Sequence, residues 1–325
     1  MLSNGPPASR PVNMHLRPIG RLAPAIFDRL DLIQEEVEAS ERKRRARDVG
    51  SAMSFRSCLR ALCLDLDAAY RLDRDMLVGV PRDSNRLNNN VAYPEFVSRR
   101  PFIDALDGLV STGHVEQVSL GSEASGKSTR VRATSKLHQH LNIGNGNASP
   151  AADHSELIRL RVGKRDKKKR VGYKDSPQTV LWRKNLEHIN RVNSNYDIRI
   201  NLSPCEWATL EATRRAEAAS KAEKTTKPFA YVRIDMSRTR LHRVFNSHDW
   251  MQGGRFYGAW WQSVPKSYRK HITINGKPIC EYDFSAIHLR LLYKKVGATV
   301  PHLLAPYDMP YGEGYREVVK QVFDK

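Results

Sequence analysis

The strongest structural signal in the chain is the decapeptide Glu281-Tyr282-Asp283-Phe284-Ser285-Ala286-Ile287-His288-Leu289-Arg290. Residues 279–284 form a short run that predicts a strand, and residues 285–293 repeat apolar side chains at helical spacing. Asp283 therefore lies at a predicted strand-to-helix junction, where Ser285 can cap the helix. A carboxylate at the end of a strand can hold a hard divalent cation such as Mg²⁺. The pattern thus favours phosphoryl-transfer chemistry.

The same residues resemble motif A of the family A DNA polymerases, which reads D-(Y/F)-S-x-I-x-L-R after a strand. The matching positions are Asp283, Phe284, Ser285, Ile287, Leu289 and Arg290, and Gly254-Arg255 and Pro265 with Arg269 precede them in the family's order. The resemblance implies that Asp283 is catalytic and binds Mg²⁺, with His288 and Arg290 near the nucleotide. His288 replaces the family's glutamate that screens the sugar 2′ position, so the choice between deoxyribose and ribose stays open.

The second carboxylate of two-metal chemistry is not evident, because no His-Asp-Glu motif follows Arg290. Arg316 and Lys320 have the R-x-x-x-K spacing that opens the family's nucleotide-binding helix. We therefore expect the front part of a polymerase-like protein, inactive by itself and completed by a C-terminal remainder or a partner subunit. The alternative is that Asp283 is an ordinary acid at the end of a strand.

The overall charge points to a polyanionic partner. The 54 Lys and Arg residues exceed the 35 Asp and Glu residues, which gives a formal net charge of +19. This favours DNA, with RNA as the other polyanion, and binding that weakens with salt. The expected contacts are the basic run Lys164, Arg165, Lys167, Lys168, Lys169 and Arg170, and the aromatic-rich segment with Arg255, Lys266 and Arg269. No apolar run suits a membrane span and no signal peptide is seen, so no membrane and a cytoplasmic location are expected.

The first half of the chain predicts a winged-helix domain. Residues 54–72 and 101–111 have helical spacing, the second ending at Thr112-Gly113, and residues 115–120 and 129–134 alternate as strands of a hairpin. In winged-helix domains the second helix enters the DNA major groove and the hairpin touches the backbone. Arg99, Arg100, Arg130 and Arg132 are the corresponding candidates for DNA contact.

Residues 121–128, Gly-Ser-Glu-Ala-Ser-Gly-Lys-Ser, match the phosphate-binding pattern G-x-x-x-x-G-K-S. A phosphate-binding loop needs a helix directly after it. Residues 129–134 alternate with β-branched side chains instead, which predicts a strand. A nucleotide hydrolase is therefore the third alternative.

Together these patterns predict an α/β (α+β) protein. We expect a flexible tail over residues 1–22, a winged-helix domain over 23–141, a linker over 142–154 and a partial polymerase-like palm over 155–325. The expected function is nucleic-acid binding by a polymerase-like nucleotidyltransferase of a replication, repair or mobile element. The competing function is a non-catalytic DNA-binding regulator or replication initiator.

Overall fold

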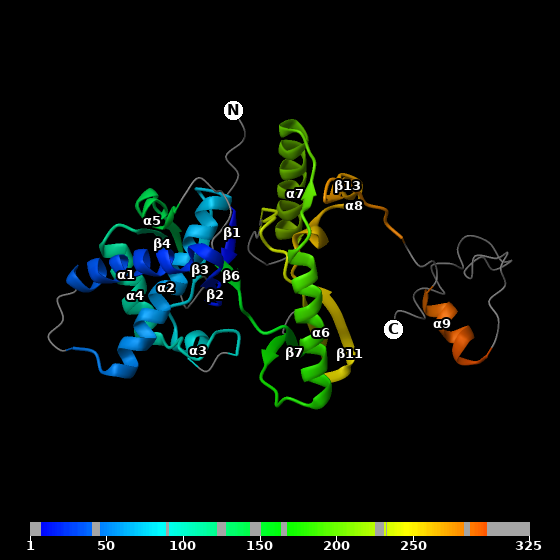
Figure 1. The fold of residues 1–325 in the computed structure, drawn as a ribbon, viewed down its shortest axis with the longest axis horizontal. Coiled ribbons are helices and arrows are strands. Elements are labelled where there is room, and N and C mark those ends of the chain that lie inside the picture. The colour runs from blue at the N-terminus through cyan, green and yellow to red at the C-terminus, as the bar shows by residue number, and fades with distance from the viewer. Residues whose placement is uncertain are drawn as a thin grey trace. The chain divides into compact units, whose positions relative to one another are not determined.

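The computed structural model describes residues 8–40, 46–88, 91–121, 128–143, 151–163, 168–224, 231, 233–282 and 287–297. The chain divides into two compact units, residues 1–277 and residues 278–325. The described residues form a mixed α/β structure of helices and several small sheets (Figure 1). The expected α+β class is therefore confirmed, although the division between the units does not fall at residues 142–154.

The N-terminal part of the first unit is built around a four-stranded sheet. Its strands lie in the order β1, β3, β5, β4, with bounds Ser9–Pro11, Leu77–Val80, Thr129–Ala133 and Val115–Ser119. β1 is parallel to β3, whereas β5 is antiparallel to both β3 and β4. The hairpin predicted over residues 115–134 is thus confirmed. Thr129, Val131 and Ala133 point into the core, while Arg130 and Arg132 lie on the other face, as the alternation predicts.

Five helices accompany this sheet: α1 (Ala23–Ser40), α2 (Val49–Leu72), α3 (Ser84–Leu87), α4 (Arg99–Ser111) and α5 (Ser135–Leu141). α2 begins after Asp48, whose side chain accepts a hydrogen bond from the Ser51 backbone N–H at 2.9 Å. α4 ends as predicted, with Gly113 at a φ of +74° and the His114 N–H bonded to the carbonyl of Leu109. The helices enclose one apolar core with the sheet.

The expected flexible tail is wrong from Ala8 onwards. Ala8, Val12 and Met14 are buried in the core, and β1 pairs with β3 from Ser9 opposite Leu77. β2 (Leu16–Pro18) pairs with β6 (Ala151–Asp153), which lies in the expected linker. Ala8, Val12, Met14 and Leu16 are the buried residues of this segment, and their contacts are with parts of the chain that are distant in the sequence.

A second sheet follows in the order β11, β10, β7, β8, with bounds Asp249–Tyr257, His242–Asn246, Ile158–Val162 and Lys169–Val171. α6 (Pro177–Ser194) lies across this sheet (Figure 1). The core between them contains Leu157, Ile158, Leu160, Leu186 and Phe245, with Trp182 and Trp250 packed against it. α6 starts with a capping box in which the Ser176 and Thr179 side chains each bond the other's backbone N–H.

The other elements of the first unit are short, apart from α7 (Pro204–Lys224). β9 (Ile198–Ile200), β12 (Ile272–Ile274) and β13 (Lys277–Pro278) form a third sheet. The single turns are η1 (Gly20–Leu22), η3 (Trp260–Ser263) and α8 (Lys266–Arg269).

The second unit contains one described helix, α9 (Ile287–Lys295), which agrees with the helix predicted over residues 285–293. The strand predicted before it is wrong over residues 279–282, which have no regular structure. β13 stops at Pro278, and proline has no N–H with which to continue a ladder. Tyr282 is 89 % exposed.

Candidate nucleic-acid interface

Four arginines from three strands lie on the face of the second sheet that points away from α6. Arg161 on β7 is directly opposite Arg170 on β8, and Arg159 is two residues before Arg161 on the same side. Val244 on β10 pairs with Arg159 on one side and with Arg255 on the other. We call Arg159, Arg161, Arg170 and Arg255 the arginine face. Parallel pairing of β7 with β10 brings together residues that are far apart in the sequence.

No carboxylate forms an ion pair with the arginine face in the part of the chain that the structure describes. The guanidinium of Arg159 instead donates to the Ser155 hydroxyl at 2.8 Å and to the Glu156 carbonyl oxygen at 3.1 Å. Like charges directly opposite on neighbouring strands repel each other. This face therefore carries positive charge that an external anion can neutralise.

The pKa values of the residues around the arginine face are lowered mainly by burial, and secondarily by neighbouring cations. Burial, with the charges of Arg170 and Arg161 beside it, lowers the pKa of Arg159 to about 10. His242 lies at the start of β10, and burial, together with Arg159 and Arg238, lowers its pKa to about 3. Arg170 also has a lowered pKa, chiefly through burial. A bound phosphate would stabilise the charged forms of these side chains and so raise their pKa values.

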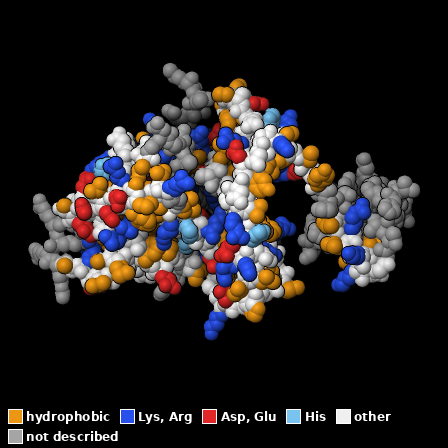
Figure 2. All heavy atoms as spheres, viewed as in Figure 1, with side chains coloured by type: hydrophobic (Ala, Val, Ile, Leu, Met, Phe, Trp, Pro, Cys, Tyr) orange, Lys and Arg blue, Asp and Glu red, His pale blue; other side chains and the backbone are white. Residues whose placement is uncertain are grey.

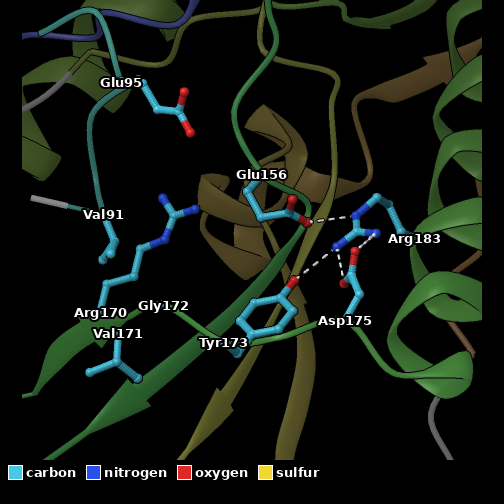
Figure 3. Close-up of a pocket in the computed structure, with 9 residues that line it drawn as sticks. All are labelled: Val91, Glu95, Glu156, Arg170, Val171, Gly172, Tyr173, Asp175 and Arg183. Atoms are coloured by element: carbon cyan, nitrogen blue, oxygen red, sulfur yellow. Dashed lines mark hydrogen bonds and ion pairs between the residues drawn. The ribbon is translucent and has the colours of Figure 1, made fainter.

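A hollow of about 430 Å³ borders the arginine face at Arg170 (Figure 3). On one side Arg183 is held by Asp175 at 2.7 Å, by Glu156 at 3.1 Å and by the Tyr173 hydroxyl at 3.2 Å. Arg170 reaches into the same hollow with none of these bonds (Figure 3). The hollow thus contains Arg183, which three groups hold, and Arg170, which forms none of these bonds and lies beside the carboxylates of Glu95 and Glu156.

Aromatic rings flank the basic residues, as the sequence predicts, and the structure divides them between core and surface. Trp250 packs edge-on against Phe245, and Trp260 is 3 % exposed. Phe256 and Tyr257 are 44 % and 46 % exposed, and Tyr257 lies opposite His242 on the side of the arginine face. An exposed ring beside cations suits the stacking of a nucleic-acid base.

The N-terminal candidates are less suited to phosphate contact than the sequence suggests. Arg100 is paired with Asp104 at 3.0 Å, and Arg132 with Glu116 at 2.8 Å and Asp75 at 3.1 Å. Arg130 donates to the Ser9 hydroxyl at 2.5 Å, and Arg99 donates to the Arg82 carbonyl oxygen at 3.2 Å. Figure 2 shows acidic and basic side chains interleaved over this part of the surface. Its positive charge is largely compensated locally.

The outer face of α4 carries two acids as well. Asp104 bonds to Arg100, and Asp107 bonds to Arg82 at 2.6 Å. Phe102, Ala105, Leu106 and Leu109 are buried against the core. The helix expected to enter a major groove therefore presents few unpaired donors to DNA.

The residues flanking the loop 121–128 contradict the nucleotide-hydrolase alternative. The Gly121 N–H bonds to the Thr129 hydroxyl, and β5 begins at Thr129, where a phosphate-binding loop needs the N-terminus of a helix. Residues 122–127 lie outside the described residues.

Other sequence candidates also lie outside the described residues: Asp283, Arg316, Lys320, Lys164, Arg165, Lys167 and the side chain of His288. Among those that are described, Lys169 and Lys266 are exposed, and the ammonium of Lys168 bonds to Asn246 at 3.3 Å. Arg269 donates to the Val264 carbonyl oxygen. Arg290 lies on α9, in the second unit.

Sequence reasoning missed Arg159, Arg238 and His242 as members of this site. The alternation of Arg159 and Arg161 with buried Ile158 and Leu160 was a usable signal, because it assigns both arginines to one face of a strand.

Comparison of the chain with models of protein families, with curated proteins and with solved structures gives no match. Within the described ranges, no helix is both long enough and apolar enough to cross a membrane.

Proposed function

We propose that this protein binds the phosphate backbone of DNA through the arginine face, as the binding part of a polymerase-like nucleotidyltransferase. The observation that carries the proposal is the cluster of Arg159, Arg161 and Arg170, none of which forms an ion pair with a described carboxylate, set beside the +19 charge of the whole chain. Arginine guanidinium groups match phosphate oxygens in geometry and charge.

The N-terminal part supports a winged-helix assignment by its topology. The order α2, β3, α3, α4, β4, β5, with β5 between β3 and β4, is that of a helix–strand–helix–helix–hairpin unit. The ion pairs on α4 and on β5 argue against major-groove docking by these elements. In this proposal the phosphate contacts come from the second sheet.

The polymerase-like part of the proposal rests on the motif around Asp283. α9, which begins four residues later, is the helix that such a motif requires. The described residues of the second unit, 278–282 and 287–297, contain one acid, Glu281, which is two residues before Asp283 in the sequence. We derive no metal-dependent step from them.

Fluorescence anisotropy with a labelled single-stranded DNA tests the binding claim. At fixed moderate salt, Arg161→Gln combined with Arg170→Gln should weaken binding at least tenfold. Arg100→Gln combined with Arg132→Gln removes the same charge from paired positions and should change affinity less than threefold. Equal losses in both double variants would contradict the assignment to the arginine face. An RNA of the same sequence shows which sugar is preferred.

Primer extension tests the catalytic part separately. With Mg²⁺ and either dNTPs or NTPs, the 325-residue chain is expected to give no product, because a single carboxylate holds Mg²⁺ poorly. Extension that disappears in Asp283→Asn would confirm the site and show that a second carboxylate is present. Extension that persists in Asp283→Asn would contradict the role of Asp283.

A further inference from the structure

Three possible metal ligands from three elements converge in the N-terminal part: Glu36 on α1, His114 just before β4 and His140 on α5. Their ligand atoms all lie within 4.8 Å of one another. Nε2 of His114 is 3.2 Å from Nδ1 of His140 and 3.6 Å from Oε2 of Glu36. Ligands of a tetrahedral Zn²⁺ ion, at about 2.0–2.1 Å from the metal, are about 3.3 Å apart. The two distances from Nε2 of His114 are therefore close to the spacing in such a site.

The hydrogen bonds of His114 allow the tautomer that binds a metal. When the Thr112 hydroxyl donates its hydrogen to the Gly108 carbonyl oxygen at 2.9 Å, its oxygen accepts from Nδ1–H of His114 at 2.8 Å. The lone pair of His114 is then on Nε2, which faces His140 and Glu36. Metal-binding histidines are commonly oriented by a hydrogen bond of this kind from the other ring nitrogen.

Hydrogen bonds among Glu36, His114 and His140 cannot give every ligand atom of this cluster a partner. Nδ1–H of His140 can donate to Nε2 of His114, but Oε2 of Glu36 then faces a nitrogen lone pair. In the described part of the chain no donor forms a hydrogen bond to that oxygen. A cation at the centre would attract all three atoms at once.

The surroundings favour a neutral imidazole at His114. Its side chain is fully buried, which disfavours the charged form. Neutral imidazole is the form that binds metals. The Lys136 ammonium bonds to Oε1 of Glu36 and, at 2.7 Å, to the Thr112 carbonyl oxygen. Oε2 of Glu36 therefore faces the two histidines. The positive charge of Lys136, however, reduces the affinity of the cluster for a cation.

We propose that Glu36, His114 and His140 bind a divalent transition-metal ion, with zinc the best match to two imidazoles and one carboxylate. Because the Glu36 side chain is 40 % exposed, a water molecule can complete the coordination from that side. The ion would fasten α1 and α5 to the start of β4. This proposal does not depend on nucleic-acid binding.

Zinc binding by the full chain tests it. The protein is stripped with a chelator, dialysed against micromolar zinc and analysed for bound metal and melting temperature. We expect one zinc ion per chain and a raised melting temperature, since a ligand that binds only the folded state stabilises it. His140→Gln and Glu36→Gln, both at partly exposed positions, should each weaken binding at least tenfold. His188→Gln, on α6, is the matched control and should keep full binding.

Cobalt(II) titration separates this site from the exposed thiols of Cys205 and Cys280. Binding at the proposed site gives ligand-field bands without a thiolate charge-transfer band. A folded wild-type chain that binds no zinc would overturn the proposal. Stoichiometric zinc retained by both variants, or a thiolate band in the cobalt spectrum, would overturn it too.

Discussion

Arg161 and Arg170 lie directly opposite each other on neighbouring antiparallel strands, and neither has a carboxylate partner among the described residues. Such a pair disfavours the free protein, and a bound phosphate would compensate the repulsion. By contrast, Arg183 in the adjacent hollow is held by Asp175, Glu156 and Tyr173. The difference between these arginines underlies the proposed function.

Replacing Gly108 by alanine should destabilise the protein although alanine is the better helix former. A Cβ at Gly108 would overlap a methyl group of buried Val37, where α4 crosses α1. Overpacking of this kind costs about 1–3 kcal/mol, which outweighs the gain of about 1 kcal/mol in helix propensity. Urea unfolding measures the loss.

Gly50→Ala is the control, because the closest atom to its Cβ is Asp48 Oδ1 at 3.4 Å. It should leave stability unchanged or slightly raised. Adding Val37→Ala to Gly108→Ala should recover part of the lost stability. A Gly108→Ala variant as stable as the wild type would show that α1 and α4 are not in such close contact.

His242 should make the protein less stable in acid. Arg159, Arg161 and Arg238 face it, with Asp153 as the opposing charge, and its folded-state pKa of about 3 lies below the ordinary value of 6.5. Between these two values the unfolded chain binds the additional proton, so stability falls as the pH falls. The slope from this single group is at most about 1.4 kcal/mol per pH unit.

The measurement compares urea unfolding of the wild type and His242→Asn from pH 7.5 to pH 4.5. The variant should show a shallower loss of stability over this range. The slopes of unfolding free energy against pH are compared, rather than the free energies themselves, because the substitution also changes packing. Parallel curves would mean that the pKa of His242 is the same in the folded and unfolded protein, which would contradict its lowered value.

The loop 121–128 should bind no nucleotide, although its sequence matches the phosphate-binding pattern G-x-x-x-x-G-K-S. β5 starts at Thr129, so no helix N-terminus is available there for phosphates. Calorimetric titration with Mg-ATP should give no signal for the wild type or for Lys127→Ala. Micromolar affinity that Lys127→Ala abolishes would restore the nucleotide-hydrolase alternative.

Local sequence patterns predicted much of the fold. The helical spacing of residues 54–72 and 101–111, the stop at Gly113 and the alternation in residues 129–134 all correspond to observed elements. These features depend on neighbouring residues alone. The pairing of Ser9 with Leu77 joins distant segments, so nothing local marks the N-terminus as part of a sheet.

The candidate site was less predictable for the same reason. Arg255 and Arg159 share a face only because β10 pairs with both β7 and β11. Arg132 looked available in the sequence, yet Asp75, far away in the chain, neutralises it. Charge patterns show how many basic residues there are, but tertiary structure decides which of them remain without partners.

The salt dependence of DNA binding tests the central claim most directly. The slope of log affinity against log salt concentration should be shallower for Arg161→Gln with Arg170→Gln than for the wild type, by about 1.4–1.8 if each arginine neutralises one phosphate. Arg100→Gln with Arg132→Gln should keep the wild-type slope. An unchanged slope in the first double variant, or an equal decrease in both, would contradict phosphate binding at the arginine face.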